Sequence, residues 1–194
     1  MHLYHYFNKA RPPFLTLTSL PFDEAFKVLT SQKDSAEFRD LPPNFFNNFL
    51  QKRYGADKVL RDKFISIGGK PIRSSPVYFT LGDNDGMKTW YDNLDWLKIP
   101  VNEFDLDTVS FTYGDSFAVF NPDLNTGEEY WGNIYKYDGI LKVIDKYGYP
   151  EDPEYDMKNR IFPKEKPINH YLKYIEAHVW SDEVLDKYRG RVNE

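Results

Sequence analysis

The chain has 194 residues, 41% of them hydrophobic, and this length and apolar content predict a single domain, while no apolar run is long enough to span a membrane. It contains no cysteine, which excludes disulfides, a thiolate nucleophile and a cysteine-type zinc site. The formal net charge of -5 argues against broad, non-specific binding of nucleic acid, because such binding depends on cations that neutralise phosphates.

The N-terminal third is predicted to contain one strand followed by helices. Leu3 to Phe7 alternate and are rich in aromatic residues, which is typical of a strand. Apolar residues recur at helical spacing from Pro21 to Gln32, with a proline at the first turn, where no amide donor is lost. The same spacing runs from Pro43 to Ile67, with Gly55 as a break and Gly68-Gly69 as a stop. Two helices or one kinked helix both fit this segment.

After Gly69, short alternating segments bounded by Gly, Asn, Asp and Pro predict a sheet. The expected strands are Val77 to Leu81, Trp96 to Val101, Thr108 to Tyr113 and Leu172 to Trp180. A short helix is expected around Met87 to Tyr91, and a longer one carries Ile140, Leu141, Ile144 and Tyr147 on one face before Gly148.

Residues 148–167 have no hydrophobic period and predict a long ordered loop or a mobile flap. The fold class is therefore α+β, with a mostly antiparallel, mixed sheet and N-terminal helices. A doubly wound parallel sheet is disfavoured because no β-α-β pattern repeats.

Alternation of side chains across a strand assigns the residues of each expected strand to two faces. In the last strand, Ile175, Ala177 and Val179 form an apolar face, and Glu176 and His178 share the other. The opposite faces of two further strands carry hydroxyl groups, from Tyr78, Thr80, Ser110 and Thr112. Two interpretations stay open: the water-facing side of an antiparallel sheet, or a cleft lined with Tyr, Thr, Ser, Glu and His. The aromatic content of 18% suits a cleft as well as a core.

Several common site chemistries lack their motifs. Glu176 and His178 share a strand face, and His5 or His170 could complete a metal set, but no HExxH spacing is present and we expect no metal. No GxSxG elbow supports a nucleophilic triad, and no P-loop or GxGxxG supports ATP hydrolysis or a dinucleotide fingerprint.

The order of several segments carries a resemblance. These are LYHYF (3–7), SPVYFTLGDNDGMKTWY (75–91), LKIPV (97–101), VSFTYGDSF (109–117) and YIEAHVWSDEVL (174–185). Over most of the chain they resemble the skeleton of DarT-like ADP-ribosyltransferases, which open with a Tyr-His strand and end with a strand that bears the catalytic glutamate. The resemblance implies that Glu176 is catalytic and orients the nicotinamide ribose, and that His5 lies beside bound NAD.

The candidate NAD-binding residues are Tyr78, Thr80 and Ser110, from the polar faces of the expected strands, together with Arg73. The chain departs from the family at two points. The family's middle strand is followed by an arginine that helps catalysis, whereas VYFTLGDNDG has none and Arg73 lies upstream; FTYGD stands in place of FTDG. The chain also resembles a set of uncharacterised bacterial proteins that begin YHYF and end YIEVQVW, which implies no activity.

Two functional hypotheses follow. The first is a cytoplasmic, NAD-dependent ADP-ribosyltransferase-like protein that uses NAD as substrate and modifies a protein or nucleic-acid acceptor. The alternative is a non-enzymatic module, associated with a phage or a defence system, that holds a nucleotide or a partner on its Tyr-rich face.

Overall fold

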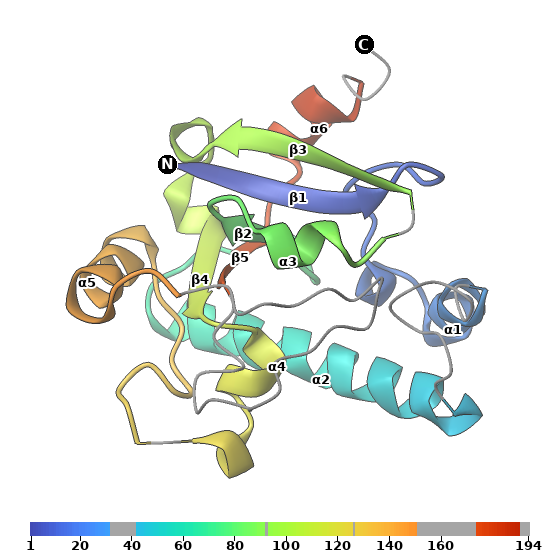
Figure 1. Cartoon of the computed structure of the whole chain (residues 1–194), viewed down its shortest axis with the longest axis horizontal. Helices are drawn as coiled ribbons and strands as arrows, with labels where there is room; N and C mark the ends of the chain where they lie inside the picture. The colour runs from blue at the N-terminus through green and yellow to red at the C-terminus, as the bar shows by residue number, and fades with distance from the viewer. Residues whose placement is uncertain (32–41, 92, 126, 151–173, 191–194) are drawn as a thin grey trace.

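A five-stranded antiparallel sheet forms the centre of the protein (Figure 1). The computed structural model describes residues 1–31, 42–91, 93–125, 127–150 and 174–190. The strand order is β3-β1-β2-β5-β4, with β1 His2–Asn8, β2 Val77–Leu81, β3 Leu94–Pro100, β4 Val109–Tyr113 and β5 Ile175–Val179. The α-helices of the described residues are α1 Phe22–Thr30, α2 Pro43–Ser66, α3 Asp85–Lys88, α4 Ser116–Val119, α5 Tyr137–Tyr147 and α6 Glu183–Arg189.

These elements confirm the α+β class and the antiparallel sheet predicted from the sequence. Each expected strand is present, with ends that differ by a few residues; the last one is described from Ile175, because residues 151–173 lie outside the described part of the chain. Most of the loop or flap expected over residues 148–167 falls there too. Within the described ranges, no helix is both long and apolar enough to cross a membrane.

Helix α2 is one continuous helix, so Gly55 does not break it. A glycine inside a helix costs only about 1 kcal/mol relative to alanine, and packing on both halves of α2 outweighs that cost. The expected stop is confirmed, since the helix ends at Ser66 and Gly68 takes a φ of 83°. A Cβ on Gly69 would lie 2.4 Å from the Phe64 ring, which explains why the second glycine is also required.

One face of the sheet is apolar and holds the main core. The prediction for β5 is confirmed, since Ile175, Ala177 and Val179 are buried there. Helices α5 and α6 pack on this face through the side chains Ile140, Val143, Val184, Leu185 and Tyr188. Burial of this many apolar side chains, each contributing about 1.5–3 kcal/mol, gives the sheet most of its stabilisation.

The other face is polar, and α2 covers it. The register aligns Thr80 with Glu176 and Thr112, and Tyr78 with His178 and Ser110, in two rows across the three strands. The C-terminal half of α2 packs Leu60 and Phe64 against this face with Trp180, while its N-terminal half packs on α1. The polar face is therefore buried beneath a helix instead of facing water.

Candidate functional site

Glu176 lies in the middle of β5 on the polar face, and its side chain is 7% exposed. Its Oε2 atom accepts hydrogen bonds from the Ser116 amide, at 3.0 Å, and from His178 Nε2, at 3.1 Å. Burial alone would raise the pKa of this carboxyl, but the His178 contact and the nearby Arg53 charge outweigh burial and lower the pKa below its ordinary value. Glu176 is therefore an anion at neutral pH.

A chain of hydrogen bonds leads from the core to this anion. Trp180 Nε1 donates to Ser110 Oγ at 2.9 Å, and Ser110 Oγ lies 3.2 Å from His178 Nδ1. Since Glu176 can only accept, His178 carries its proton on Nε2, and its Nδ1 accepts from the Ser110 hydroxyl. The order Ser-His-Glu has the form of a nucleophile relay, but Ser110 is fully buried and cannot meet a substrate. The chain fixes the orientation of His178 and Glu176.

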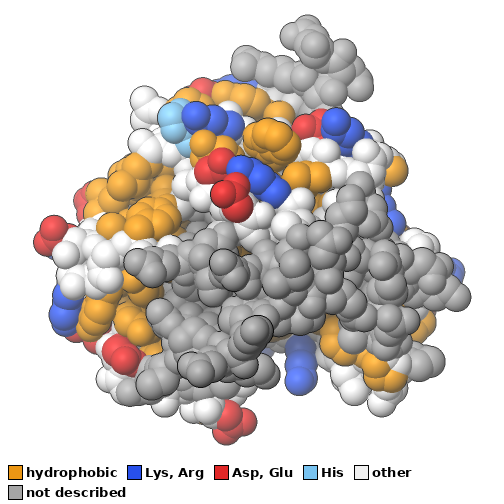
Figure 2. Space-filling model, viewed as in Figure 1, with side chains coloured by type: hydrophobic (Ala, Val, Ile, Leu, Met, Phe, Trp, Pro, Cys, Tyr) orange, Lys and Arg blue, Asp and Glu red, His pale blue; other side chains and the backbone are white. Residues whose placement is uncertain are grey.

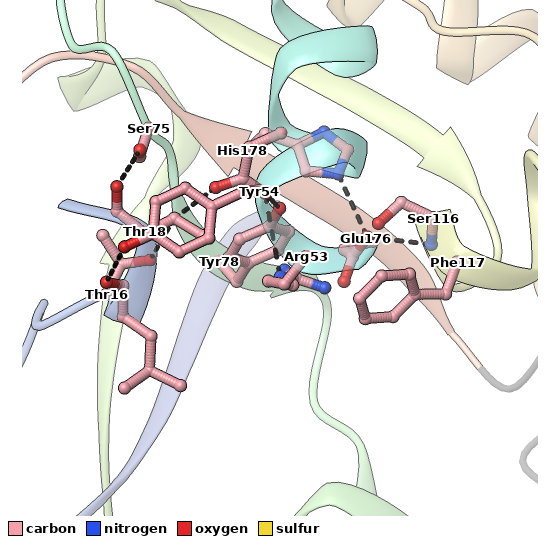
Figure 3. Close-up of polar contacts among 12 residues, drawn as sticks. Thr16, Thr18, Arg53, Tyr54, Ser75, Tyr78, Ser116, Phe117, Glu176 and His178 are labelled. Carbon is pink, nitrogen blue, oxygen red and sulfur yellow. Dashed lines mark hydrogen bonds and ion pairs between the residues drawn. The ribbon is translucent and has the colours of Figure 1, made fainter. Parts of the chain in front are cut away.

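Arg53, from α2, supplies the cation of this network (Figure 3). Its guanidinium carbon lies 3.6 Å from the centre of the Tyr78 ring and 4.7 Å from that of Phe117. Burial would lower its pKa, but the negative groups around it raise the pKa above its ordinary value. Arg53 is therefore permanently charged, and the two aromatic faces hold its position.

Asp57 balances part of that charge. Its Oδ1 atom lies 3.7 Å from Nε of Arg53, which is one turn earlier on α2. The Asp57 carboxylate also accepts hydrogen bonds from the hydroxyls of Tyr78 and Thr18. Because these donors come from β2 and from the segment before α1, Asp57 ties three parts of the chain together beneath α2.

A second carboxyl, Asp115, lies beside the Glu176 charge at the start of α4. Its Oδ1 accepts from the Phe117 amide at 2.7 Å, as a helix N-cap, and its Oδ2 accepts from the Tyr174 hydroxyl at 3.2 Å. Burial and the like charge of Glu176 raise the pKa of Asp115. The structure thus holds two carboxyl groups whose pKa values are displaced in opposite directions, an arrangement typical of functional sites.

A groove of about 1210 Å³ runs between α2 and the α4 region, next to these carboxyl groups. Aromatic rings make up much of its wall, from Phe45, Phe49, Trp90, Phe117, Phe120 and Tyr174. Lys52 and Lys63 line it on the α2 side, and Asp115 and Ser116 line it on the α4 side. The volume is enough for a ligand of dinucleotide size, and flat rings are the natural contacts of such walls. On the face drawn in Figure 2, acidic and basic side chains lie side by side near α3.

The structure brings four of the expected site residues to one face but not into the groove. Tyr78, Thr80, Ser110 and Glu176 all lie on the polar face. Thr80 is buried and donates to the Gly82 carbonyl, while Tyr78 and Ser110 serve the network beneath α2. None of these side chains lines the groove. The cleft expected on this face is filled by α2.

The other two expected site residues lie elsewhere. Arg73 pairs with Asp182 at the start of α6, and it is not a groove residue. His5, which the resemblance places beside bound NAD, lies on the opposite face of the sheet from Glu176, because β1 pairs with β2 in a register that puts His5 on the apolar face. There its Nδ1 donates to the Tyr78 carbonyl at 2.9 Å, and its Nε2 accepts from the Phe14 amide at 3.0 Å.

Sequence reasoning missed Arg53, Asp57, Asp115 and Ser116. A signal for the first pair was present, since Arg53 and Asp57 are spaced i, i+4 within a helical segment whose apolar residues alternate with charges. Asp115 and Ser116 follow β4 after one glycine, where an Asp N-cap is a common helix start. The hydrogen bond from the Ser116 amide to Glu176, and the effect of the Glu176 charge on Asp115, depend on the tertiary fold and have no local signal.

Within the described ranges, no group of three or more His, Asp or Glu side chains is placed to hold a metal ion. Fold and site together define an α+β protein with a charged network beside an aromatic groove. Comparison of the chain with protein-family models, with curated proteins and with solved structures gave no match.

Proposed function

We propose that the protein is an NAD-dependent ADP-ribosyltransferase that binds NAD in the groove between α2 and α4 and modifies a protein or nucleic-acid acceptor. The observation that carries the proposal is the state of Glu176. Its Oε2 atom is fixed by two donors, the carboxyl is ionised, and no hydrogen bond among the described residues engages Oε1. A fixed negative charge stabilises an oxocarbenium-like transition state, and Oε1 is the carboxylate oxygen that can face it.

The groove supports the choice of ligand. Its aromatic walls suit the two flat rings of NAD, and Lys52 and Lys63 suit the pyrophosphate. In the proposed reaction the bond between ribose C1′ and nicotinamide breaks, and nicotinamide leaves with the electron pair. Glu176 stabilises the cationic ribosyl carbon, the acceptor forms the new bond to C1′, and its proton passes to the Asp115 carboxylate.

The test is NAD consumption by the full chain, followed as release of nicotinamide, in the wild type and in Glu176→Gln. The amide keeps the shape of the side chain but removes its charge, so we expect the rate to fall by at least about 100-fold, the typical loss when one charge-stabilising group is removed. Thr80→Val is the matched control, because Thr80 is the row neighbour of Glu176, does not line the groove and donates to the Gly82 carbonyl. Wild-type protein that leaves NAD intact would refute the transferase.

One observation favours the alternative hypothesis of a non-enzymatic nucleotide-binding module. Glu176 itself is not a groove-lining residue, although Ser116, whose amide donates to Glu176, is one. A thermal-shift experiment distinguishes the two functions, because any ligand that binds only the folded state raises the apparent stability of the protein. A module without activity gives the shift with NAD, leaves NAD uncleaved, and keeps the shift in Glu176→Gln.

A further inference from the structure

Strand β3 lies at one end of the sheet, and it is paired along its inner edge, with β1 (Figure 1). The opposite end of the sheet is closed, because Phe111 of β4 exchanges two backbone hydrogen bonds of 2.8 Å with Tyr135. Within the described ranges, no segment closes the outer edge of β3 in this way. The free edge of this seven-residue strand is a template for pairing with another strand.

The backbone groups that point outward from β3 follow from its pairing with β1. The Val101 amide donates to the Met1 carbonyl at 3.2 Å, which continues the register of the two strands. Because bonded and non-bonded pairs alternate in an antiparallel ladder, the odd-numbered residues of β3 bond to β1. The Trp96 amide agrees with this assignment, since its hydrogen bond goes to Asp95 Oδ1 at 2.9 Å. The outward amides and carbonyls are those of Leu94, Trp96 and Lys98.

The side chains of this edge are complementary to those of a second copy in one register. An antiparallel pair centred on Leu97 places Trp96 opposite Lys98 of the second copy, with their outward amides and carbonyls in position to bond. Trp96 is 47% exposed, and Lys98 Nζ lies 5.7 Å from the centre of the Tyr4 ring. Each Lys98 then lies between two aromatic rings, Tyr4 of its own chain and Trp96 of the other, and both attract a cation.

The neighbouring registers lack this complementarity. A shift of two residues in one direction opposes the two Lys98 charges, and the same shift in the other direction opposes Lys98 to Leu94. A shift of one residue joins the apolar face of one sheet to the polar face of the other. The register centred on Leu97 keeps the faces continuous. Because Leu97 packs partly on the main core, its contact with Leu97 of the second copy extends that core across the interface.

We infer that β3 pairs antiparallel with β3 of a second copy about Leu97, so that two sheets join into one continuous sheet across a homodimer. The interface is isologous, since the same edge serves on both sides. The Trp96 amide must leave Asp95 before it can donate to the second copy, which keeps the association weak and reversible. The inference is independent of the proposed function, because no residue of β3 lines the groove.

The first experiment is sedimentation equilibrium of the full chain over a range of concentrations. We expect a dimer whose fraction rises between about 10 μM and 1 mM, as for a small transient interface. Lys98→Pro removes an outward amide that β1 does not use, and proline is tolerated at such edge positions. Lys98→Ala is the matched control, since it also loses the cation but keeps the amide. The proline variant should dimerise at least about 10-fold more weakly than the alanine variant, because two intermolecular hydrogen bonds are lost per dimer.

The second experiment tests the register without relying on the proline variant. The chain contains no cysteine, so a single introduced one can pair only with its own copy. Leu97→Cys places two Cα atoms about 4.5 Å apart in a non-bonded pair, within the range that a disulfide spans. Asp95→Cys is the control, because two copies of this position lie about 13 Å apart in the same register. Non-reducing gel electrophoresis after oxidation should show a covalent dimer for Leu97→Cys and a monomer for Asp95→Cys.

Three results overturn the inference. A wild-type chain that stays monomeric at about 1 mM leaves the edge to a strand of a different partner. A folded Lys98→Pro protein that dimerises as tightly as Lys98→Ala places the interface elsewhere. So does a dimer that cross-links equally through the two cysteine positions, or through neither.

Discussion

The amide of Ser116 donates a 3.0 Å hydrogen bond to Glu176 Oε2, across 60 residues of sequence. This contact joins the start of α4 to the polar face of β5 and places the groove beside the buried carboxylate. Because the donor is a backbone group, substitutions of the Ser116 side chain leave it intact, and only proline removes it.

Ser116→Pro is therefore a specific probe of this bond. Proline is well tolerated at the first position of a helix, and the preceding Asp115 already has an extended conformation, with ψ of 127°. We expect the free energy of unfolding to fall by about 1.5–3 kcal/mol, as for a hydrogen bond to a charged group. Urea denaturation measures the change, with Ser116→Ala as the control for loss of the hydroxyl. A proline variant as stable as the alanine variant would contradict the assigned role of the amide.

His5 should make the stability depend on pH. Burial lowers its pKa from 6.5 to about 4, although the bond to the Tyr78 carbonyl opposes this. The unfolded chain therefore binds a proton that the folded protein does not, so stability is full above about pH 6.5 and falls as the pH drops toward 4. The shift corresponds to about 3 kcal/mol. Denaturation between pH 4 and 7 should show this slope in the wild type and a flatter one in His5→Gln, with His2→Gln as the control.

Asp115→Asn should stabilise the protein at pH 7. Burial and the Glu176 charge raise the pKa of Asp115, so ionised Asp115 lowers the free energy of unfolding. Asparagine caps a helix about as well as aspartate and removes that cost. The gain should be full above the folded-state pKa and should disappear as the pH falls below the ordinary value of 3.8, because the wild-type carboxyl is then protonated in both states. Melting temperatures at pH 7 and pH 3.5 test this, and a lower value for the variant at pH 7 would count against it.

Arg53→Met should be among the most destabilising single substitutions in the chain. It removes the cation that faces Asp57 and Glu176, and an unpaired buried charge costs about 3–5 kcal/mol. Adding Asp57→Asn should recover part of the loss, so the double variant should be more stable than the sum of the two single effects predicts. Strict additivity in this cycle would mean that the two side chains are not coupled.

The α+β class, the strands and the α2 stop were predictable because they depend on local periodicity and on glycine conformation. The alternation in β5 also assigned Glu176 and Ile175 to the correct faces. The position of His5 was not predictable, because a shift of one residue in strand pairing moves a side chain to the other face. The sequence also did not indicate that α2 would cover the polar face. In the sequence, Arg53 and Asp57 resemble solvated charges on a helix surface, because their partners lie on distant segments of the chain.

The hydrogen-bond chain from Trp180 to Glu176 gives the protein an internal optical reporter. The Trp180 indole is fully buried, stacks 6.4 Å from the Phe64 ring and reaches Glu176 through Ser110 and His178. Indole emission responds to nearby charge and to its hydrogen-bond acceptor, so a change in the charge state at Glu176 should alter the fluorescence of Trp180, which lies on the same face at the end of β5. In a variant in which the other three tryptophans are replaced, Trp180 emission should therefore report on the charge state of Glu176 without any dye or attached probe.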